Sequence, residues 1–308
     1  MVGEKHIDLR KSIIKLKRKS ILFVDKLHFS VIKNRLRYLF EIEFIKKISE
    51  NCRIVSPEQT LNELQYAIQN NNRGIYLRFG DGDVFLLNNQ SDAYQEKSVL
   101  LADEMKECFS LNDEGIFKCL AIHSEMYGYS KEMVIGNHKN KDGFAFNLFK
   151  NCYEYFSGCK IYSPVALHFI STINPVRANE FLKILKSKTT VFIGNENVRN
   201  STIELLFGSK AKHIKTPSKN AYSEIDSIEK EVLNEIDDKT DFFVMCVAMG
   251  CSGRPLMKRL WMKSLNKNFF LFDFGSLLDG IEGNNSRTWL KMNQINYQQL
   301  LNGLNIIE

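Results

Sequence analysis

Two aspartates alternate with two glycines directly after a short apolar run, in a pattern that suits a cation site. Residues 74–79 read GIYLRF, and residues 80–83 read GDGD. The glycines would allow the positive φ angles of a sharp turn from which both carboxylates project. Because hard divalent cations such as Mg²⁺ and Mn²⁺ prefer carboxylate oxygens, we predict a metal site at Asp81 and Asp83 that in turn binds an anionic group. A solvated acidic turn is the alternative, since Asp-Gly pairs are common in turns.

Four later segments place small or polar residues where predicted strands end. One of them, residues 250–253 (GCSG), precedes a predicted helix, where free backbone N–H groups and the helix dipole favour a phosphate. Lys219 and Arg254 would add positive charge. Structural roles are the alternative, because Asn220 is a good helix cap and Gly253 would allow close strand-to-helix packing. The candidate residues in these segments are Gly194, Asn195, Lys219, Asn220, Gly250, Ser252, Gly253 and Asp273.

The elements that must position these residues alternate between strands and helices from Ser56 onward. Strands are predicted at 74–79, 116–122, 189–193, 213–215, 242–249 and 269–274. Helices are predicted from residue 57, at 96–109, 142–156, from 164, and at 175–186, 198–207, 218–236 and 253–265. Near-continuous apolar strands separated by helices predict an α/β fold with a mostly parallel sheet and helices on both faces. Ligands of such sheets lie at the carboxyl ends of the strands.

The positive charge of the chain is concentrated at its N-terminus. The 308 residues carry a net charge of +6, and residues 1–50 hold 13 Lys/Arg and 6 Asp/Glu, a balance of +7. We predict a basic amphipathic helical arm over residues 1–55, a core domain over 56–283 and a helical tail over 284–308. Residues 10–40 of the arm would lie on an anionic membrane surface, bind a partner helix or cover the core domain. The tail would pack on the core or on a second subunit of a homo-oligomer.

Composition excludes several classes of protein. Seven cysteines occur without a Cys-x-x-Cys pair, and several stand in apolar runs, so we expect reduced buried thiols and a cytoplasmic protein. No apolar run approaches the ~18 residues that span a bilayer, and the N-terminus lacks a signal-peptide core. Basic residues are not interleaved with stacking aromatics elsewhere, so nucleic acid is not an expected partner. The chain has no Walker A motif, no third glycine of a dinucleotide fingerprint and no zinc-type spacing.

Five landmarks in order give the sequence a family resemblance. They are residues 78–83 (RFGDGD), 190–195 (TVFIGN), 216–222 (TPSKNAY), 249–253 (MGCSG) and 272–275 (FDFG). This series resembles the GT-D glycosyltransferase family, whose members typically show Arg-Phe-Gly-Asp-Gly-Glu, Pro-x-x-Asn-Ala-Phe, Gly-Pro-Thr-Ala-like and Asp-Ile-Gly-His segments. The chain departs from that pattern at Asp83 (usually Glu), Tyr222 (Phe), residues 251–253 (Pro-Thr-Ala) and Ser276 (His).

The resemblance implies a Rossmann-like GT-D domain that binds a nucleotide sugar, a UDP-sugar, together with Mn²⁺ or Mg²⁺. Asp81 and Asp83 would hold the metal directly or through water, and the metal would stabilise the departing nucleoside diphosphate. Arg78 would pair with phosphate or orient Asp81. The expected donor pocket consists of Arg78, Gly80, Gly82, Gly194, Asn195, Lys219, Asn220, Gly250, Ser252 and Gly253.

A hexosyltransferase of this kind would act on a glycan, lipid-linked or protein-linked acceptor in surface polysaccharide or glycoconjugate synthesis. An inverting reaction needs a carboxylate to accept the proton of the acceptor hydroxyl, and Glu224, Asp273 and Asp279 are the candidates. The basic arm would suit a peripheral position at the inner membrane face. Two other functions remain open: a non-catalytic nucleotide-binding partner of a glycan-synthesis complex, and another Rossmann-like transferase such as a methyltransferase. Hydrolysis or transfer of a UDP-sugar would separate the first from an enzyme, and metal-dependent UDP binding would speak against the second.

Overall fold

The computed structural model describes residues 52–120, 153–236, 241–263, 268–284, 287–292 and 294–304. The predicted N-terminal arm lies outside these ranges except for its last four residues. Most of the helix predicted over 142–156 also lies outside them, so both stay predictions. Within the described ranges, no helix combines the length and apolar character needed to cross a membrane.

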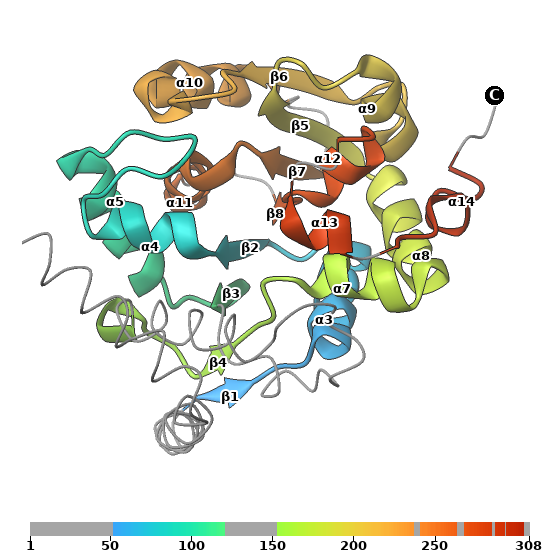
Figure 1. Cartoon of the computed structure of the whole chain (residues 1–308), viewed down its shortest axis with the longest axis horizontal. Coiled ribbons are helices and arrows are strands. Elements are labelled where there is room, and N and C mark those ends of the chain that lie inside the picture. The colour runs from blue at the N-terminus through green and yellow to red at the C-terminus, as the bar shows by residue number, and fades with distance from the viewer. Residues whose placement is uncertain are drawn as a thin grey trace, which may run out of the picture. The chain divides into compact units, whose positions relative to one another are not determined.

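A six-stranded parallel sheet forms the centre of the described structure. Its strands follow the order β3-β2-β8-β7-β5-β6, and every ladder between neighbours is parallel. Figure 1 shows the strands stacked in this order, with β6 at the top and β3 towards the bottom. The strands are β2 (Gly74–Phe79), β3 (Ile116–Leu120), β5 (Thr189–Asn195), β6 (Lys212–Thr216), β7 (Phe242–Ala248) and β8 (Asn268–Asp273). A separate parallel pair joins β1 (Arg53–Ile54) to β4 (Lys160–Ile161).

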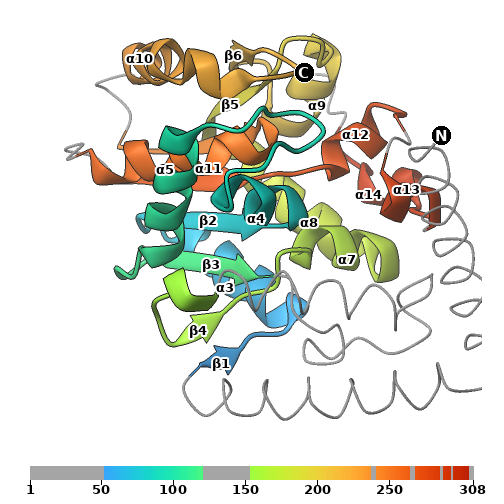
Figure 2. The ribbon, with the colours of Figure 1, turned by 60° about the vertical axis from the view of Figure 1, so that its left-hand side comes forward.

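Helices lie on both sides of this sheet, with α5 and α11 to the left of the stack and α3, α7 and α8 to the right (Figure 1). Figure 2 shows α4 directly beyond one end of β2. The α-helices of the core are α3 (Pro57–Gln69), α4 (Asp81–Leu87), α5 (Val99–Ser110), α7 (Ala166–Ile173), α8 (Pro175–Lys186), α9 (Asn200–Phe207), α10 (Ile225–Glu235) and α11 (Gly253–Met262). Short helices follow at α12 (Leu277–Ile281), α13 (Thr288–Met292) and α14 (Tyr297–Leu300). The 3-10 turns within the described ranges are η2 (Tyr153–Tyr155), η3 (Ala221–Glu224) and η4 (Gly250–Ser252).

The central strands are apolar over most of their length because both of their faces are covered. All residues of β7 except the last are buried, and so are all residues of β8 after Asn268. Stacked and tilted aromatic rings, including Tyr76, Phe181, Phe192, Phe270 and Phe272, fill the face covered by α3, α7 and α8. Burial of this apolar area is the main source of stability for such a sheet. The predicted α/β architecture with a mostly parallel sheet is confirmed.

Three predicted helices differ at their ends for identifiable reasons. The helix expected to begin at Ser218 is interrupted, because Asn220 adopts a left-handed conformation with φ of 55°. A 3-10 turn follows, and α10 begins only at Ile225. Helix α5 begins after Ser98, whose hydroxyl caps the amide of Leu101, rather than near residue 96. Helix α11 ends at Met262 rather than at residue 265.

Candidate active site

The acidic GDGD segment forms the first turn of α4 rather than a glycine turn with positive φ. Gly80 is the N-cap residue with an extended φ of −120°, and neither glycine of the segment has a positive φ. The Asp83 carboxylate folds back and accepts a hydrogen bond from the Gly80 amide at 2.7 Å. A carboxylate in this place satisfies one of the free N–H groups at the helix start. Only the Asp81 side chain projects into solvent.

Close packing around position 82 leaves room only for glycine. A Cβ atom at this position would lie 2.6 Å from Oδ2 of Asp92 and 2.7 Å from Sγ of Cys251. Those two groups are themselves joined, because the Cys251 thiol donates to Oδ2 of Asp92 at 3.2 Å. The first turn of α4 is therefore pressed against the loop that follows α4 and against the turn that follows β7.

Arg254 joins two buried carboxylates at the centre of the site. Its Nε lies 3.2 Å from Oδ1 of Asp83, and its Nη2 lies 3.1 Å from Oδ2 of Asp273. The same Nε donates to the backbone carbonyl of Arg78 at 2.6 Å, and Nη1 donates to the carbonyl of Gly250. Asp83 and Asp273 are only 2% and 3% exposed. Arg254 thus fixes the start of α4, the end of β8 and the turn after β7 to one another.

A second arginine holds Asp273 from the other side. Nη1 of Arg78 lies 3.5 Å from Oδ1 of Asp273, its Nε donates to the carbonyl of Pro164, and its Nη2 lies 3.4 Å from Nε2 of His168. His168 is buried and packs edge-on against Trp289. Asp273, predicted as a catalytic residue or a turn cap, is therefore neutralised by two arginines.

Burial and these ion pairs shift the ionisation of the site. Burial raises the pKa of Asp83 to about 6, although Arg254 and the Gly80 amide act in the opposite direction. Burial alone would lower the pKa of Arg254, but Asp273 and Asp83 raise it above its ordinary value. Burial and the neighbouring Arg78 hold the pKa of His168 well below its usual range, so this imidazole stays neutral near pH 7. Perturbed carboxyl groups beside a cavity are typical of functional sites.

The turn between β7 and α11 exposes backbone toward the same region. Gly250 has a φ of 61°, and no described atom lies within 4 Å of the position that a Cβ atom would occupy there. The chain then passes through η4 into α11, a helix of 10 residues. The Gly253 amide donates to the carbonyls of Gly250 and Cys251, and Pro255 has no N–H, so few amides at this helix start are free. The Ser252 hydroxyl is buried and donates to Oε1 of Gln95 at 2.8 Å.

The loop after α4, residues 91–97, is fixed to two strand ends. Oε1 of Gln95 also accepts from the Tyr222 amide at 3.1 Å. The Asn220 side chain accepts from the Glu96 amide at 2.8 Å, and its own amide donates to the carbonyl of Tyr94 at 2.8 Å. Asn220, predicted as a donor-binding residue or a helix cap, therefore holds the 91–97 loop in place.

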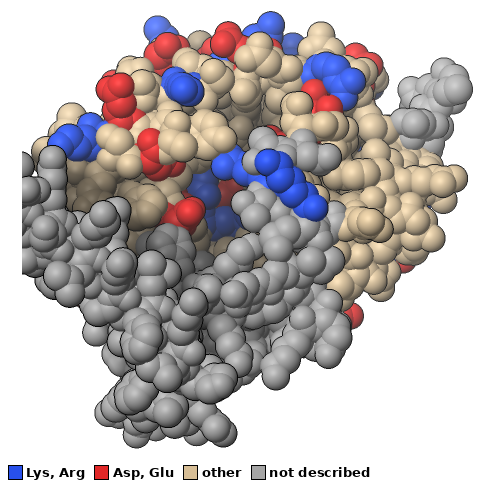
Figure 3. Space-filling model, in the orientation of Figure 1, with Lys and Arg blue, Asp and Glu red and all other residues tan. Residues whose placement is uncertain are grey.

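Two adjoining cavities open at the carboxyl ends of the strands. The first, here the acidic cavity, has a volume of about 340 Å³ and is lined by charged side chains: Arg78, Asp81, Asp83, Asp92, Arg254, Asp273, Asp279, Glu282 and Arg287. The second, here the side cavity, has a volume of about 390 Å³ and is lined by Tyr94, Thr216, Lys219, Asn220, Ser252 and Arg287, among others. Both cavities share Gly250, Cys251, Asn195 and Asp279 as well as Tyr94 and Arg287. Figure 3 shows acidic and basic atoms together in a hollow of the described surface.

Most of the predicted site residues come together here, and three do not. Arg78, Gly80, Asp81, Gly82, Asp83 and Asp273 line the acidic cavity, Lys219, Asn220 and Ser252 line the side cavity, and Asn195 and Gly250 line both. Gly194 and Gly253 line neither, because Phe192 and the side chains of Val247 and Met249 occupy the space beside them.

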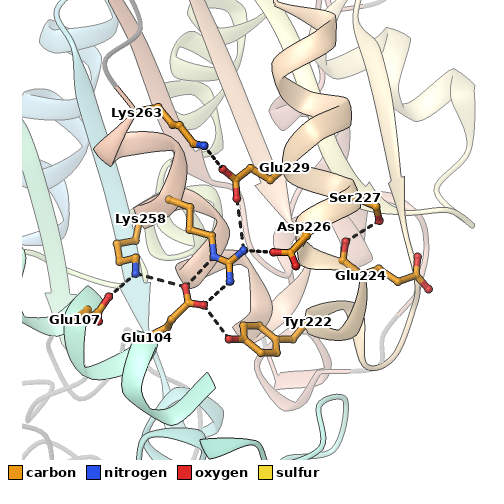
Figure 4. Close-up of polar contacts among 10 residues, drawn as sticks. Glu104, Glu107, Tyr222, Glu224, Asp226, Ser227, Glu229, Lys258 and Lys263 are labelled. Carbon is orange, nitrogen blue, oxygen red and sulfur yellow. Dashed lines mark hydrogen bonds and ion pairs between the residues drawn. The ribbon is translucent and has the colours of Figure 1, made fainter. Parts of the chain in front are cut away.

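Glu224 also lines neither cavity. It is exposed at the end of η3, and Figure 4 shows its carboxylate pointing away from the ion-pair network around Glu104. That network joins α5, α10 and α11, because Arg259 contacts Glu104, Asp226 and Glu229. Glu104 also accepts from the Tyr222 hydroxyl at 2.8 Å, so the network holds η3, which directly follows Asn220, in place.

Several residues that line the two cavities could not be identified as site residues from the sequence pattern. Asp92, Tyr94 and Gln95 stand in a polar loop without periodicity, and Arg287 stands in a tail predicted only to pack. Arg254 was expected to add positive charge, but its pairing with two carboxylates was not foreseen. The side-chain contacts that reveal these residues span long sequence separations, 157 residues for Gln95 and Ser252.

A cavity larger than these two lies elsewhere among the described residues. It has a volume of about 1020 Å³ and is lined by residues at the starts of β3 and β8 and by Arg73 and Trp261. Arg73 stacks on Trp261 at 4.4 Å and donates to its backbone carbonyl. None of the predicted site residues lines this cavity, so we place the candidate active site at the acidic and side cavities.

Comparison with known proteins identifies the fold. The family model described as Glycosyltransferase GT-D fold matches residues 76–275, which contain most of β2 and all of α4, the Gly250 turn and β8. A solved structure described as a new glycosyltransferase (DUF1792) from Streptococcus sanguinis is 19% identical, with a TM-score of 0.59 over 81% of this chain and 92% of that chain. A second, described as a highly conserved domain of unknown function 1792 with a distinct glycosyltransferase fold, is 20% identical, with a TM-score of 0.58 over 79% and 84%. No curated protein sequence matches the chain significantly.

Proposed function

Because this chain belongs to the GT-D glycosyltransferase fold family, we propose that it transfers a hexosyl group from a UDP-sugar to an acceptor hydroxyl. One observation supports this proposal most strongly. Two cavities meet at a backbone turn that follows β7 and precedes α11, with six carboxylates lining one cavity and the exposed Lys219 lining the other. A nucleotide sugar has a matching division, since its diphosphate joins a planar nucleoside to a sugar.

The carboxylates of the acidic cavity suit a divalent cation. Six carboxylates line it against three arginines, Arg78, Arg254 and Arg287, so an added diphosphate would meet net negative charge unless a cation accompanied it. No group of three His, Cys, Asp or Glu residues with metal-binding geometry occurs in the described part of the chain. A Mg²⁺ or Mn²⁺ site of one or two carboxylates, completed by water and phosphate oxygens, agrees with both facts.

Asp81 is the residue that would hold this cation directly. Its carboxylate is exposed at the acidic cavity, whereas Asp83 is buried, with Oδ2 accepting from the Gly80 amide and Oδ1 in an ion pair with Arg254. Asp83 would therefore act through water and through its charge. When bound, the metal would neutralise charge on the leaving diphosphate.

The residues of the chain account for the remaining requirements of the transfer. The backbone of the exposed Gly250 turn and the dipole of α11 would stabilise phosphate oxygens. Lys219 is exposed at the side cavity, and its ammonium group has no ion pair or hydrogen bond among the described residues. It would therefore be available to a phosphate. Arg254 already neutralises Asp83 and Asp273, so its role is to keep the site rigid.

Asp279 is the carboxylate that we propose as the proton acceptor of an inverting reaction. It lines both cavities, and its side chain lies 3.4 Å from Nε of Arg287 at the shared boundary. Asp273 is paired with two arginines, and Glu224 lies outside both cavities. The proposal includes a glycan or lipid-linked molecule as the acceptor. It also includes contact of residues 10–40 with a membrane surface, and these residues lie outside the described ranges.

Calorimetric titration with UDP, GDP, CMP and S-adenosylmethionine, each with Mn²⁺ and with chelator, tests the proposal together with a transfer and hydrolysis assay on UDP-sugars. We expect metal-dependent UDP binding, and a loss of kcat/KM of at least about 100-fold in Asp81→Asn, equivalent to about 2.7 kcal/mol. Asp103→Asn, which changes an exposed carboxylate on α5 outside both cavities, is the matched control. A folded protein that binds S-adenosylmethionine, or that binds no nucleotide, would contradict a UDP-sugar transferase.

A further inference from the structure

Two cysteines come side by side where the described chain begins. Strand β1 pairs in parallel with β4, with Arg53 opposite Lys160, and the next step of this register towards the N-terminus places Cys52 opposite Cys159. The Arg53 amide donates to the Cys159 carbonyl at 2.7 Å, so the ladder extends to this pair. Figure 1 and Figure 2 both show β1 and β4 side by side. Two thiols that are far apart in the sequence are therefore neighbours in the fold.

The spacing of this pair suits a disulfide. Opposed residues of neighbouring strands have Cα atoms about 4.8 Å apart and direct their side chains to the same face of the sheet. Disulfides join Cα atoms that are roughly 4.4–6.8 Å apart. The Cys52 thiol already points towards the partner strand, because its Sγ donates at 3.2 Å to the carbonyl of Gly158, the residue before Cys159. Oxidation would therefore need rotation of side chains rather than movement of strands.

The two thiols differ in their access to solvent. Cys159 is exposed, although the sequence pattern predicts buried thiols, whereas Cys52 is only 5% exposed. An oxidant in solution therefore reaches Cys159 first, and Cys52 lies behind it as a second thiol. This combination is typical of redox-sensing cysteines, which are accessible and lie next to a resolving thiol. Elsewhere in the described strands, Cys119 and Cys246 are buried and stand opposite no cysteine.

A buried cation lies beside the pair. Lys118 in β3 is 3% exposed, and its ammonium group donates to the carbonyls of Phe109, at 2.7 Å, and of Ser157, two residues before Cys159. Burial lowers the pKa of Lys118 to about 8, and the nearby Cys52 acts in the opposite direction. Burial and Cys159 raise the pKa of the Cys52 thiol, whereas Lys118 lowers it. The Lys118 ammonium group therefore stabilises the Cys52 thiolate when it forms.

We propose that Cys52 and Cys159 form a reversible disulfide, with a low-molecular-weight disulfide such as glutathione disulfide as the oxidant. The Cys159 thiolate attacks one sulfur of the oxidant and releases one glutathione thiolate, which leaves Cys159 in a mixed disulfide. The Cys52 thiolate then attacks the Cys159 sulfur and releases the second glutathione thiolate. The two protein thiols are oxidised, the oxidant is reduced to two glutathione molecules, and these molecules take up the two protons of the protein thiols.

The bridge would fix the point at which residues 1–51 join the described fold. Cys52 follows residue 51 directly, and only two residue pairs form the ladder between β1 and β4. A covalent link between these strands would close a loop of about 100 residues, which constrains the unfolded chain and stabilises the folded one. Neither cysteine lines the acidic cavity or the side cavity, so the inference does not depend on the proposed function.

The test incubates the full-length protein with glutathione disulfide, alkylates the remaining thiols and identifies the linked peptides by mass spectrometry. We expect the free thiols counted after denaturation to fall by two from the seven of the reduced chain, and dithiothreitol to restore them. Trypsin leaves Cys152 and Cys159 in one peptide, residues 151–160, so chymotrypsin is added to cut between them. The bridge should then join Cys52 to the fragment that contains Cys159.

Serine variants separate the two steps of the reaction. Cys52→Ser should accumulate glutathione on Cys159, because the second thiol is missing. Cys159→Ser should form no bridge and take up no glutathione at Cys52, because this thiol is buried. Cys152→Ser, a change in the same tryptic peptide, is the matched control and should form the bridge as the parent does. Circular dichroism checks that each variant is folded.

Thermal unfolding gives a second, independent measurement. The oxidised parent should unfold at a Tm about 5 °C or more above that of the reduced parent, because the bridge closes a long loop. Cys159→Ser treated with glutathione disulfide should show no such rise, whereas Cys152→Ser should show it.

Several results would overturn the inference. One is a folded parent that keeps all seven thiols after this treatment. A second is a bridge from Cys52 to Cys152, or a disulfide between two copies of the chain on a non-reducing gel, since either would assign different partners. A third is a folded Cys52→Ser protein without glutathione on Cys159, which would show that the exposed thiol is not the one that reacts first.

Discussion

At the scale of single residues, the site is a compact arrangement of buried charges. Arg254 separates Asp83 from Asp273, and all three side chains are nearly inaccessible to solvent. Breaking a buried ion pair by removing one partner leaves an uncompensated charge in the core, which is strongly destabilising. The three residues therefore form a rigid frame, and the exposed Asp81 beside them is free to bind.

The raised pKa of Asp83 makes this frame sensitive to pH. The folded carboxyl titrates at about 6, above the ordinary value of 3.8, so the folded protein binds a proton at a higher pH than the unfolded chain does. Stability contributed by this group therefore rises as the pH falls from about 6 towards 3.8. We expect Asp83→Asn to lose this contribution. As the pH falls from about 6 to 3.8, the free energy of unfolding of the parent, measured with urea, should therefore rise relative to that of the variant.

Metal-dependent UDP binding should weaken over the same pH range in which the stability of the protein rises. Protonation below about pH 6 removes the charge that Asp83 contributes, so binding should weaken as the pH falls through that value. Identical pH profiles of stability for the parent and Asp83→Asn would show that Asp83 titrates as an ordinary carboxyl group.

At the scale of elements, α4 is positioned by what its first turn touches. The turn contacts Arg254 through Asp83, and it contacts Asp92 and Cys251 through Gly82. The 91–97 loop that follows α4 is in turn bonded to Ser252 and Asn220. The helix, the loop and the strand ends are therefore coupled, and a shift in one changes both cavities.

Gly82→Ala is a direct test of this coupling. Alanine is the better helix former by about 1 kcal/mol, so propensity alone predicts a more stable protein. The added Cβ atom would lie within 2.7 Å of both Asp92 and Cys251, so we expect instead a loss of about 1–3 kcal/mol from overpacking, measured by urea unfolding.

Gly80→Ala is the matched control for stability. The nearest described atom to a Cβ at Gly80 is Oδ2 of Asp83 at 3.9 Å, and the φ of −120° is allowed for alanine. This variant should unfold within about 1 kcal/mol of the parent. A Gly82→Ala protein as stable as Gly80→Ala would mean that the loop yields without cost.

The sequence indicates the elements of this protein better than their contacts. Strands such as β5 and β7 are predictable because burial on both faces makes them continuous apolar runs, and the Gly250 turn is recognisable from its glycines. The glycines at 80 and 82 were predicted to have positive φ, and they do not. Gly80 is an extended N-cap that other residues could also adopt, and Gly82 is required by close packing. Gln95 and Arg287 escaped detection because their importance comes from partners far away in the chain, Ser252 and Tyr94.

At the scale of the whole molecule, the described fold begins at Cys52. The N-terminal strand β1 pairs with β4, the Val55 amide donates to Ile161, and the Val55 side chain is fully buried. These contacts precede residue 56, where the core domain was predicted to start.

Two shortened chains would locate the boundary. We expect a chain that begins at Cys52 to unfold cooperatively, and a chain that begins at Ser56 to be less stable by about 2 kcal/mol or more, because it lacks β1 and the buried Val55. Urea unfolding followed by far-UV circular dichroism measures the difference. Equal stability of the two chains would place β1 outside the cooperative unit.

The order of the sheet has a consequence for how the protein is made. Strands β8 and β7 lie in the middle of the sheet but come last in the chain, between β2 and β5. While the ribosome synthesises the first three quarters of the chain, the β2–β3 and β5–β6 pairs have no strand to join them, and their inner edges stay open to other chains. Asp83 and Arg254 likewise meet only when α11 has emerged. The nascent protein should therefore need protection from aggregation until late in its synthesis, and it should gain its sheet and its site nearly together.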